Sequence, residues 1–280
     1  PEYMDDAMRL RDKIRAELDN PDSSFRYDNM RFRLSYQKLA SNAEWIILRK
    51  INANVATLTS LGYPPHIATL LGSLGRRDGL IMLSGATGPG ETTTCFALLK
   101  EYLLRFGGVG ITVEDPVEYE LDGPVGENGY CYQVQVDRDE DWTPRYILVG
   151  EVRSPRAAEQ ILRAATTGHL VITTIHAGSI EESFMGLMHL ASQSMDQGAN
   201  FMLAQGLTAA CHQSLTASGP YLRYITTEEN NNGDPVRALI RDNRVGMINT
   251  YIDKQIARMN MVASANPGLA PGQSAADAKK

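Results

Sequence analysis

Apolar and polar positions follow two different periods in the first sixty residues. Residues 3–18 carry apolar side chains at helical spacing among charged ones, which predicts an exposed amphipathic helix that ends at the turn residues 20–22. Shorter segments alternate with a period of two, and these predict strands at 25–27, 30–34 and 44–51. We therefore expect residues 1–60 to form a small α+β domain.

From residue 79 the pattern changes to short, uniformly apolar runs separated by helical segments. Such runs are typical of strands buried on both faces of a parallel sheet, and we predict them at 79–84, 110–113, 146–150 and 169–174. Helices are predicted at 65–74, 92–106 and 155–166, with residues 180–261 mostly helical. The alternation indicates an α/β domain over 61–261 with a mainly parallel sheet covered on both faces. The small, polar, Pro- and Gly-bearing stretch 262–280 is expected to be a disordered tail.

Composition narrows the functional classes. The chain is 43% hydrophobic and 21% charged, which is ordinary for a globular protein. Its formal net charge of -6 gives no global basic field that would favour nucleic acid. No apolar run approaches the roughly 20 residues that cross a bilayer, and no signal-peptide pattern opens the chain. Three scattered cysteines fit free thiols in a reducing compartment, so we predict a cytoplasmic protein.

A glycine-rich motif follows the run at 79–84. Residues 85–92 read Gly-Ala-Thr-Gly-Pro-Gly-Glu-Thr, and the phosphate-binding loop has the pattern GxxxxGK[ST] between a strand and a helix. Its glycines let backbone amides surround phosphate oxygens at a helix N-terminus. The residues predicted to bind a nucleotide here are Gly85, Thr87, Gly88, Gly90, Glu91, Thr92 and Thr93, with the hydroxyl of Thr92 on Mg²⁺. The alternative interpretation is a glycine-rich turn without a ligand.

Glu91 stands where the phosphate-loop pattern has lysine. A lysine there meets the β- and γ-phosphates, and one unit-charge pair at about 4 Å and an effective dielectric near 20 is worth about 4 kcal/mol. A glutamate loses that attraction and adds a comparable repulsion. Pro89 also removes one backbone N–H. We predict that the loop binds ATP poorly and hydrolyses it very slowly.

Two acidic motifs follow predicted strands, where ligand sites of open α/β sheets lie. Residues 113–119 carry Glu114, Asp115 and Glu118, which can hold a magnesium-bound water and take its proton; the alternative is a solvated acidic turn. In residues 147–153 an apolar strand delivers Glu151, the arrangement of a Walker B motif facing Mg²⁺.

Two histidines bracket the predicted strand at 169–174. Either could sense a γ-phosphate or position water. His176 is the stronger candidate, and a role for His169 stays open. The other three histidines lie in no comparable setting and receive no role.

The ordered set of motifs resembles a known family. It looks like that of the PilT-like, DotB-like and TraJ-like ATPases, of the GspE/PulE type, in pilus, conjugation and type IV secretion machines. Their motifs are called Walker A, Asp box, Walker B and His box. The matching segments here are, in the same order, the phosphate loop, Glu-Asp-Pro-Val-Glu, Leu-Val-Gly-Glu-Val-Arg and Thr-Gly-His-Leu-Val-Ile-Thr-Thr-Ile-His. The similarity extends over roughly 24–260.

The resemblance implies a RecA-like motor domain and a small N-terminal domain with ATP and Mg between them. It implies a homohexameric ring on the cytoplasmic face of the inner membrane, with a membrane platform protein of a pilus or secretion machine as partner and no direct nucleic-acid contact. Turnover would power pilus retraction, conjugative transfer or secretion. By this likeness Glu114 or Glu118 is the catalytic base, Glu151 and His176 act beside it, and Thr92, Asp115 and Glu151 hold the metal. The nucleotide arginines come from Arg26, Arg31, Arg33 and Arg49.

The chain departs from the family pattern at three places. Glu91 and Pro89 alter the loop, the N-terminal domain looks as though its first half were missing, and the stretch between Asp box and Walker B is about ten residues short. A parallel crossover needs about a dozen residues, more than 137–145 supplies, and Pro144 discourages a helix there. We therefore expect 131–136 to be part of a hairpin, with a helix lost.

Two functions remain open from the sequence. One is an ATP-hydrolysing motor subunit impaired by Glu91, and the other is a catalytically inactive structural subunit of the same machine. A RecA-type helicase shares the phosphate loop, but the Asp and His boxes disfavour it.

Overall fold

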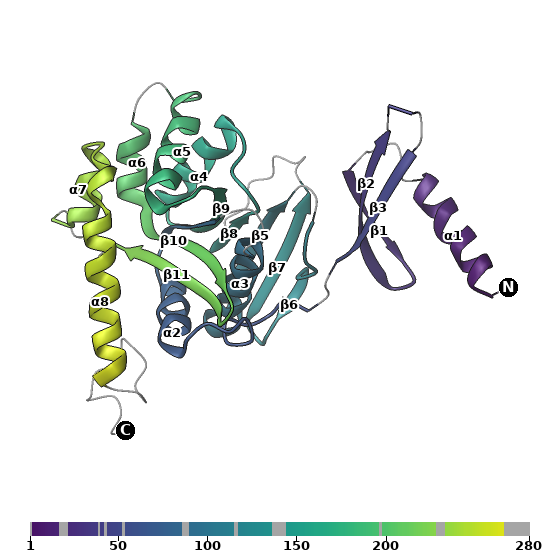
Figure 1. Ribbon diagram of the computed structural model, residues 1–280, viewed down its shortest axis with the longest axis horizontal. Coiled ribbons are helices and arrows are strands. Elements are labelled where there is room, and N and C mark those ends of the chain that lie inside the picture. Colours follow the sequence, from purple (N-terminus) through teal and green to yellow (C-terminus); the bar gives the residue numbers. More distant parts are fainter. Residues whose placement is uncertain are drawn as a thin grey trace.

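The computed structural model describes ten ranges of the chain: 2–16, 22–38, 40–41, 44–51, 54–85, 90–114, 117–135, 144–195, 198–227 and 233–265. A small N-terminal unit comes first. Helix α1 (Glu2–Ala16) packs on an antiparallel sheet of β1 (Asp22–Tyr27), β2 (Met30–Lys38) and β3 (Glu44–Lys50), in that order (Figure 1). Ile14, Phe25 and Leu34 form its buried centre.

Two residues with left-handed backbone make the turn between β1 and β2. Asp28 and Asn29 have φ of 47° and 59°. This is the conformation of the two-residue turns that match strand twist, and Asp and Asn tolerate it better than most residues. The turn sets the register in which Arg26 lies opposite Arg31.

An eight-stranded sheet forms the body of the described chain. Its order is β11-β10-β4-β9-β8-β5-β7-β6, and the strands from β10 to β7 run parallel. The strands are β4 (Gly79–Gly85), β5 (Gly108–Glu114), β6 (Gly123–Val125), β7 (Gly129–Gln135), β8 (Tyr146–Val149), β9 (Leu170–His176), β10 (Leu207–Thr216) and β11 (Gly219–Thr226). Only the two edge strands, β11 and β6, run antiparallel to their neighbours.

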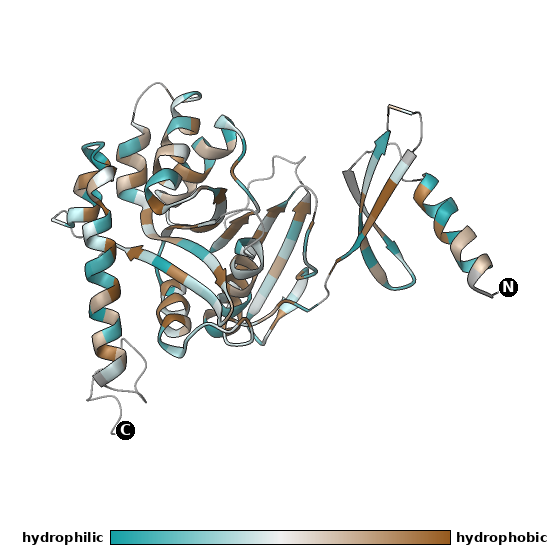
Figure 2. Cartoon of the chain, in the orientation of Figure 1, coloured by the Kyte–Doolittle hydropathy of each residue, from teal (hydrophilic) through white to brown (hydrophobic). Residues whose placement is uncertain are grey.

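Helices cover both faces of this sheet. They are α2 (Pro65–Ser73), α3 (Glu91–Phe106), α4 (Pro155–Ala165), α5 (Ile180–Ser192), α6 (Ala199–Gly206), α7 (Pro235–Arg241) and α8 (Asn249–Ala265), with 3₁₀ turns at Leu74–Arg76 and Val245–Met247. Every residue of β4 is buried, and its side chains alternate between two cores. Leu80 and Met82 pack with α4, α5 and α6, whereas Ile81 and Leu83 pack with α2 and α3. Figure 2 shows brown, hydrophobic segments along strands of this sheet. The predicted α/β fold with a mainly parallel sheet is confirmed.

The prediction that 180–261 is mostly helical is wrong over 207–226. These residues form the hairpin β10–β11, and β10 adds to the large sheet beside β4. Its Ala209, Ala210 and Cys211 are fully buried between sheet neighbours and both cores. Burial in a sheet has overridden the helix preference of its alanines and leucines, because strand propensity depends on packing rather than on the residue alone.

The described residues extend past the predicted end of the α/β domain. Helix α8 continues to Ala265, four residues past the expected end at 261, and the rest of the predicted tail lies outside the described residues. The boundary between 60 and 61 stays a prediction. No described helix is both long and apolar enough to span a membrane.

The strand predicted at 131–136 does belong to a hairpin. β7 pairs antiparallel with β6 and, on its other side, parallel with β5, which separates it from β8. β7 and β8 are therefore parallel strands on the two sides of β5. Residues 136–143 lie outside the described part, so the lost helix remains a prediction.

Candidate functional site

The predicted motifs converge because the strands that carry them are parallel. β4, β9, β8 and β5 are successive neighbours, so their carboxyl ends share one edge of the sheet. Gly85 lies opposite His176 in the β4–β9 register, and Val113 lies opposite Val149 in the β5–β8 register. The phosphate loop, Asp box, Walker B segment and His box consequently meet at the edge where ligands of such sheets bind.

The phosphate loop joins the central strand to α3. Residues 86–89, including Thr87 and Gly88, lie outside the described residues, and Gly85 and Gly90 flank them. Gly90 caps α3 with φ of +85°, a conformation for which glycine pays no steric cost. Its carbonyl accepts a hydrogen bond from Thr94 N at 3.0 Å. Thr92 and Thr93 then lie in the first turn, where backbone N–H groups have no partner within the helix and can bind an anion.

Glu91 is the first residue of α3 and is only 6% exposed. Among the described residues no group hydrogen-bonds its Oε1. Its negative charge sits at the positive end of the helix dipole, the same place that a phosphate would take. The hydroxyl of Thr92 and the carboxylate of Glu151 are oxygen ligands of the kind that suit Mg²⁺. The carboxylate of Glu91 opposes phosphate binding at this position, because the two negative charges repel each other.

In the Asp box, Glu114 is buried and fully engaged. It is 3% exposed, and it accepts hydrogen bonds from Thr112 Oγ1 at 2.7 Å, Glu118 N at 2.9 Å and Gln133 Nε2 at 3.0 Å. Burial raises the pKa of Glu114, and these hydrogen bonds oppose the rise. Asp115, the predicted metal ligand, lies outside the described residues.

Two residues that sequence reasoning missed organise the Asp box. Gln133 on β7 also donates to Tyr119 O at 2.9 Å and accepts from Leu121 N at 2.8 Å. Tyr119 packs on Phe96, and its hydroxyl lies 2.5 Å from Thr93 Oγ1, so the box is tied to the first turn of α3. Only the β5–β7 register brings Gln133 here, and no local pattern signals it.

The Walker B and His boxes are brought together as predicted. His176 Nε2 lies 3.4 Å from Glu151 Oε1, and Arg153 Nε donates to Glu151 Oε2 at 2.7 Å. β9 fixes the turn before Glu151, since Thr174 Oγ1 donates to Gly150 O at 2.6 Å. This places a carboxylate and an imidazole beside the end of β4.

His169 is not part of this site. It precedes β9 at the opposite edge of the sheet, and its Nδ1 lies 2.6 Å from Pro144 O. His176 is the last residue of β9, so the length of this strand, on the order of 20 Å, separates the two histidines. The possible role for His169 is therefore wrong, and its hydrogen bond is structural.

The four candidate arginines share one face of the small sheet. Arg26 lies opposite Arg31 and Arg33 opposite Arg49, and residues 31 and 33 point the same way along β2. Arg33 Nη1 is 3.7 Å from Glu118 Oε1, and Arg26 forms an ion pair with Glu120.

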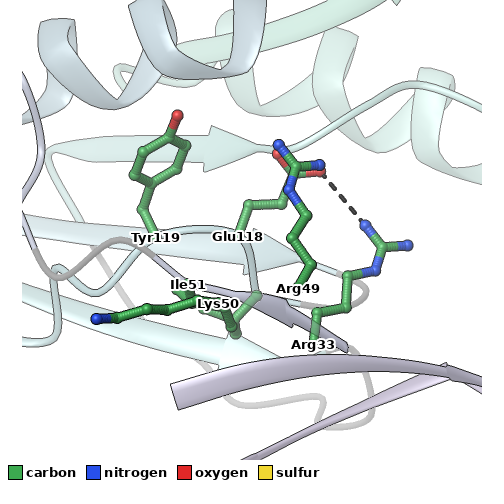
Figure 3. A pocket seen from close by; sticks show the side chains of 7 residues that line it. Arg33, Arg49, Lys50, Ile51, Glu118 and Tyr119 are labelled. Carbon is green, nitrogen blue, oxygen red and sulfur yellow. Dashed lines mark ion pairs between the residues drawn. The ribbon is translucent and has the colours of Figure 1, made fainter. Parts of the chain in front are cut away.

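A pocket joins this arginine face to the Asp box. Its lining residues are Arg33, Arg49, Lys50, Ile51, Val117, Glu118 and Tyr119. Figure 3 shows Arg33 and Arg49 reaching from the small sheet toward Glu118. Arg49 thus lies beside an Asp-box carboxylate, and its contact with a nucleotide stays a prediction.

Comparison with known proteins gives one family. The profile of the family described as "Type II/IV secretion system protein" matches residues 22–261. Type II secretion system protein E of Klebsiella pneumoniae is 32% identical over 192 residues, which cover 63% of this chain and 36% of that protein. The chain thus spans about a third of that relative's length.

Two solved structures share the fold. The pilus retraction motor PilT with bound ADP superposes with a TM-score of 0.67 at 25% identity, covering 92% of this chain and 76% of PilT. The ATPase DotB of Legionella pneumophila superposes with a TM-score of 0.68 at 20% identity, covering 90% and 74%.

Proposed function

Because the chain belongs to the type II/IV secretion system protein family, we propose that it is a subunit of an ATP-driven ring motor whose phosphate site is impaired by Glu91. The observation that carries the proposal is the meeting of loop, Asp box, Glu151 and His176 at one sheet edge, with a buried carboxylate in place of the loop cation.

The residues divide into those that suit Mg·ATP and one that opposes it. Gly85, Gly90 and the first turn of α3 offer backbone N–H groups, and Thr92 and Glu151 offer oxygen ligands for the metal. ATP with bound Mg²⁺ supplies a phosphoryl group that water can attack. Glu91 introduces repulsion of about 4 kcal/mol per charge pair at 4 Å, which is the reason to expect weak binding.

We favour Glu118 over Glu114 as the base. Glu114 already accepts three hydrogen bonds and is buried, so its place in the site is to hold the Asp box. Glu118 is partly exposed and faces the pocket beside Arg33, where it can reach a water.

We infer the assembly and the partners from the likeness to the family. A homohexameric ring, peripheral to the cytoplasmic face of the inner membrane, would act on a membrane platform protein of a pilus, conjugation or secretion machine. The arginine face would complete the nucleotide site, because a guanidinium is suited to binding phosphate.

A catalytically inactive subunit is the second candidate. The buried carboxylate of Glu91, whose Oε1 has no hydrogen-bond partner among the described residues, favours it, because a family member that keeps the fold but repels phosphate can still occupy a place in a ring.

Magnesium-dependent ATP hydrolysis separates the two. The unaltered chain is measured beside Glu91→Lys, with Glu91→Lys/Thr92→Ala as the control for a contaminating ATPase. Turnover by Glu91→Lys alone supports a motor silenced at one residue. If neither turns over, the inactive subunit is the better account, and equal turnover by both contradicts the proposal.

A further inference from the structure

Three buried side chains meet beneath the start of α3. Tyr63 OH donates to Gln213 Oε1 at 2.5 Å, Thr94 Oγ1 lies 2.9 Å from the same oxygen, and the two hydroxyls are 3.0 Å apart. Each residue is at most 4% exposed. They come from three separate segments, and Gln213 on β10 lies opposite Gly85 at the end of β4.

The side chain of Thr94 connects this group to Gly90, the residue that ends the phosphate loop. Thr94 Oγ1 also lies 3.2 Å from Gly90 O, the carbonyl of the residue that ends the loop. A threonine hydroxyl has one hydrogen, so it can donate to Gly90 O or to Gln213 Oε1 but not fully to both. The Gln213 oxygen has two lone pairs and can accept from both hydroxyls, so the group holds Thr94 Oγ1 within 3.2 Å of Gly90 O whichever oxygen takes the Thr94 hydrogen.

Tyr63 belongs to the segment that leads from the small sheet to α2. This segment is held along α3 at a second point, where Lys100 Nζ donates to Val55 O at 2.8 Å. Val55 and Leu58 are also buried in the core on the α3 side. A shift of this segment would therefore disturb both of its contacts with α3, the one at Thr94 and the one at Lys100.

We propose that Tyr63 is a positioning residue for the phosphate loop. With Gln213 it holds the hydroxyl of Thr94 beside the Gly90 carbonyl, and it thereby couples the segment behind the small sheet to the start of α3. That the loop receives phosphate rests on the proposed function, whereas the hold on Gly90 does not.

A purely structural tyrosine is the alternative, and the chain supplies a matched control. Tyr102 is 0% exposed, and its hydroxyl donates to Leu71 O at 2.8 Å, away from the loop. Tyr102→Phe removes one buried hydroxyl just as Tyr63→Phe does. A difference between the two variants therefore depends on where the lost hydroxyl lies, and not merely on the loss of one buried hydrogen bond.

The first readout is amide hydrogen exchange of the whole chain, followed by mass spectrometry. Tyr63→Phe should speed exchange in peptides that cover 85–95 by about twofold to tenfold, the factor that corresponds to one net hydrogen bond. Tyr102→Phe should leave those peptides unchanged and speed exchange in α2. Thr94→Val, which removes the other hydroxyl at nearly constant shape, should reproduce the effect of Tyr63→Phe.

Equal acceleration of 85–95 by Tyr63→Phe and Tyr102→Phe would overturn the proposal, and so would no acceleration by Tyr63→Phe. The second readout is the Kd of Mg·ADP in the Glu91→Lys background, which Tyr63→Phe should raise by a similar factor and Tyr102→Phe should not. Absence of ADP binding by Glu91→Lys itself would count against the proposed function alone, because the exchange result does not depend on a nucleotide.

Discussion

Replacing Glu114 with glutamine should change how the stability of the protein depends on pH. Glu114 is 3% exposed, and burial raises its pKa despite hydrogen bonds from Thr112, Glu118 and Gln133. The folded protein thus holds this proton more tightly than the unfolded chain does. The resulting stabilisation is fully present below the unfolded pKa, near 4.5, and is lost as pH rises through the higher folded pKa.

The size of the effect is bounded by one proton. One proton corresponds to at most about 1.4 kcal/mol per pH unit between the two pKa values. Glutamine does not titrate, so the unfolding free energy of Glu114→Gln minus that of the unaltered chain should rise with pH over this window and then level off. At low pH the difference is a constant, because Glu114 is protonated in both the folded and the unfolded chain and glutamine does not titrate.

Urea unfolding at several values from pH 4 to pH 8 measures this difference, with the slope of free energy against urea as a check on two-state behaviour. Glu159→Gln is the control with the opposite sign. A hydrogen bond from Arg163 lowers the pKa of Glu159, so its contribution is present above the unfolded pKa and is lost as pH falls. A free-energy difference for Glu114→Gln that stays flat or falls as pH rises would refute the reasoning.

Two further predictions concern the pocket and the cap of α3. A double-mutant cycle of Arg33→Ala and Glu118→Ala should give a coupling of about 0.2–1 kcal/mol, since the side chains are 29% and 39% exposed, and the coupling should shrink in 0.5 M salt; a salt-independent value would mean the ion pair is not the cause. Gly90→Ala should lower the unfolding free energy by about 1–2 kcal/mol, because the φ of Gly90 is +85°. Gly186→Ala in α5, where the added methyl meets Ile175 Cδ1 at 3.4 Å, should raise it by about 0.5–1 kcal/mol. Thermal unfolding measures both changes, and the same sign for the two variants would contradict this reasoning.

The sequence predicted the helices and strands that can be recognised from their own hydrophobic pattern. The apolar runs of β4, β5, β8 and β9 each lead into a motif of the site, so the meeting of Glu151 and His176 could be expected from parallel strands alone. β10 could not be recognised, because its alternation is masked by small residues that both cores bury.

Which side chains contact one another within the site depends on the register of the strands, and the sequence alone does not reveal that register. Gln133 reaches Glu114 only because β7 pairs with β5, and Tyr63 reaches Gln213 from 150 positions away. His169 failed for the opposite reason. Its nearness in sequence to His176 suggested a shared role, yet a strand carries the two to opposite edges of the sheet.

The central claim is that Glu91 weakens the phosphate site through its charge, and calorimetric titration of Mg·ATP tests it most directly. Glu91→Gln removes the repulsion and Glu91→Lys also restores attraction, each step worth up to about 4 kcal/mol at 4 Å. The account predicts Kd values that fall from the unaltered chain to Glu91→Gln to Glu91→Lys. An unaltered chain that binds Mg·ATP as tightly as Glu91→Lys would contradict it.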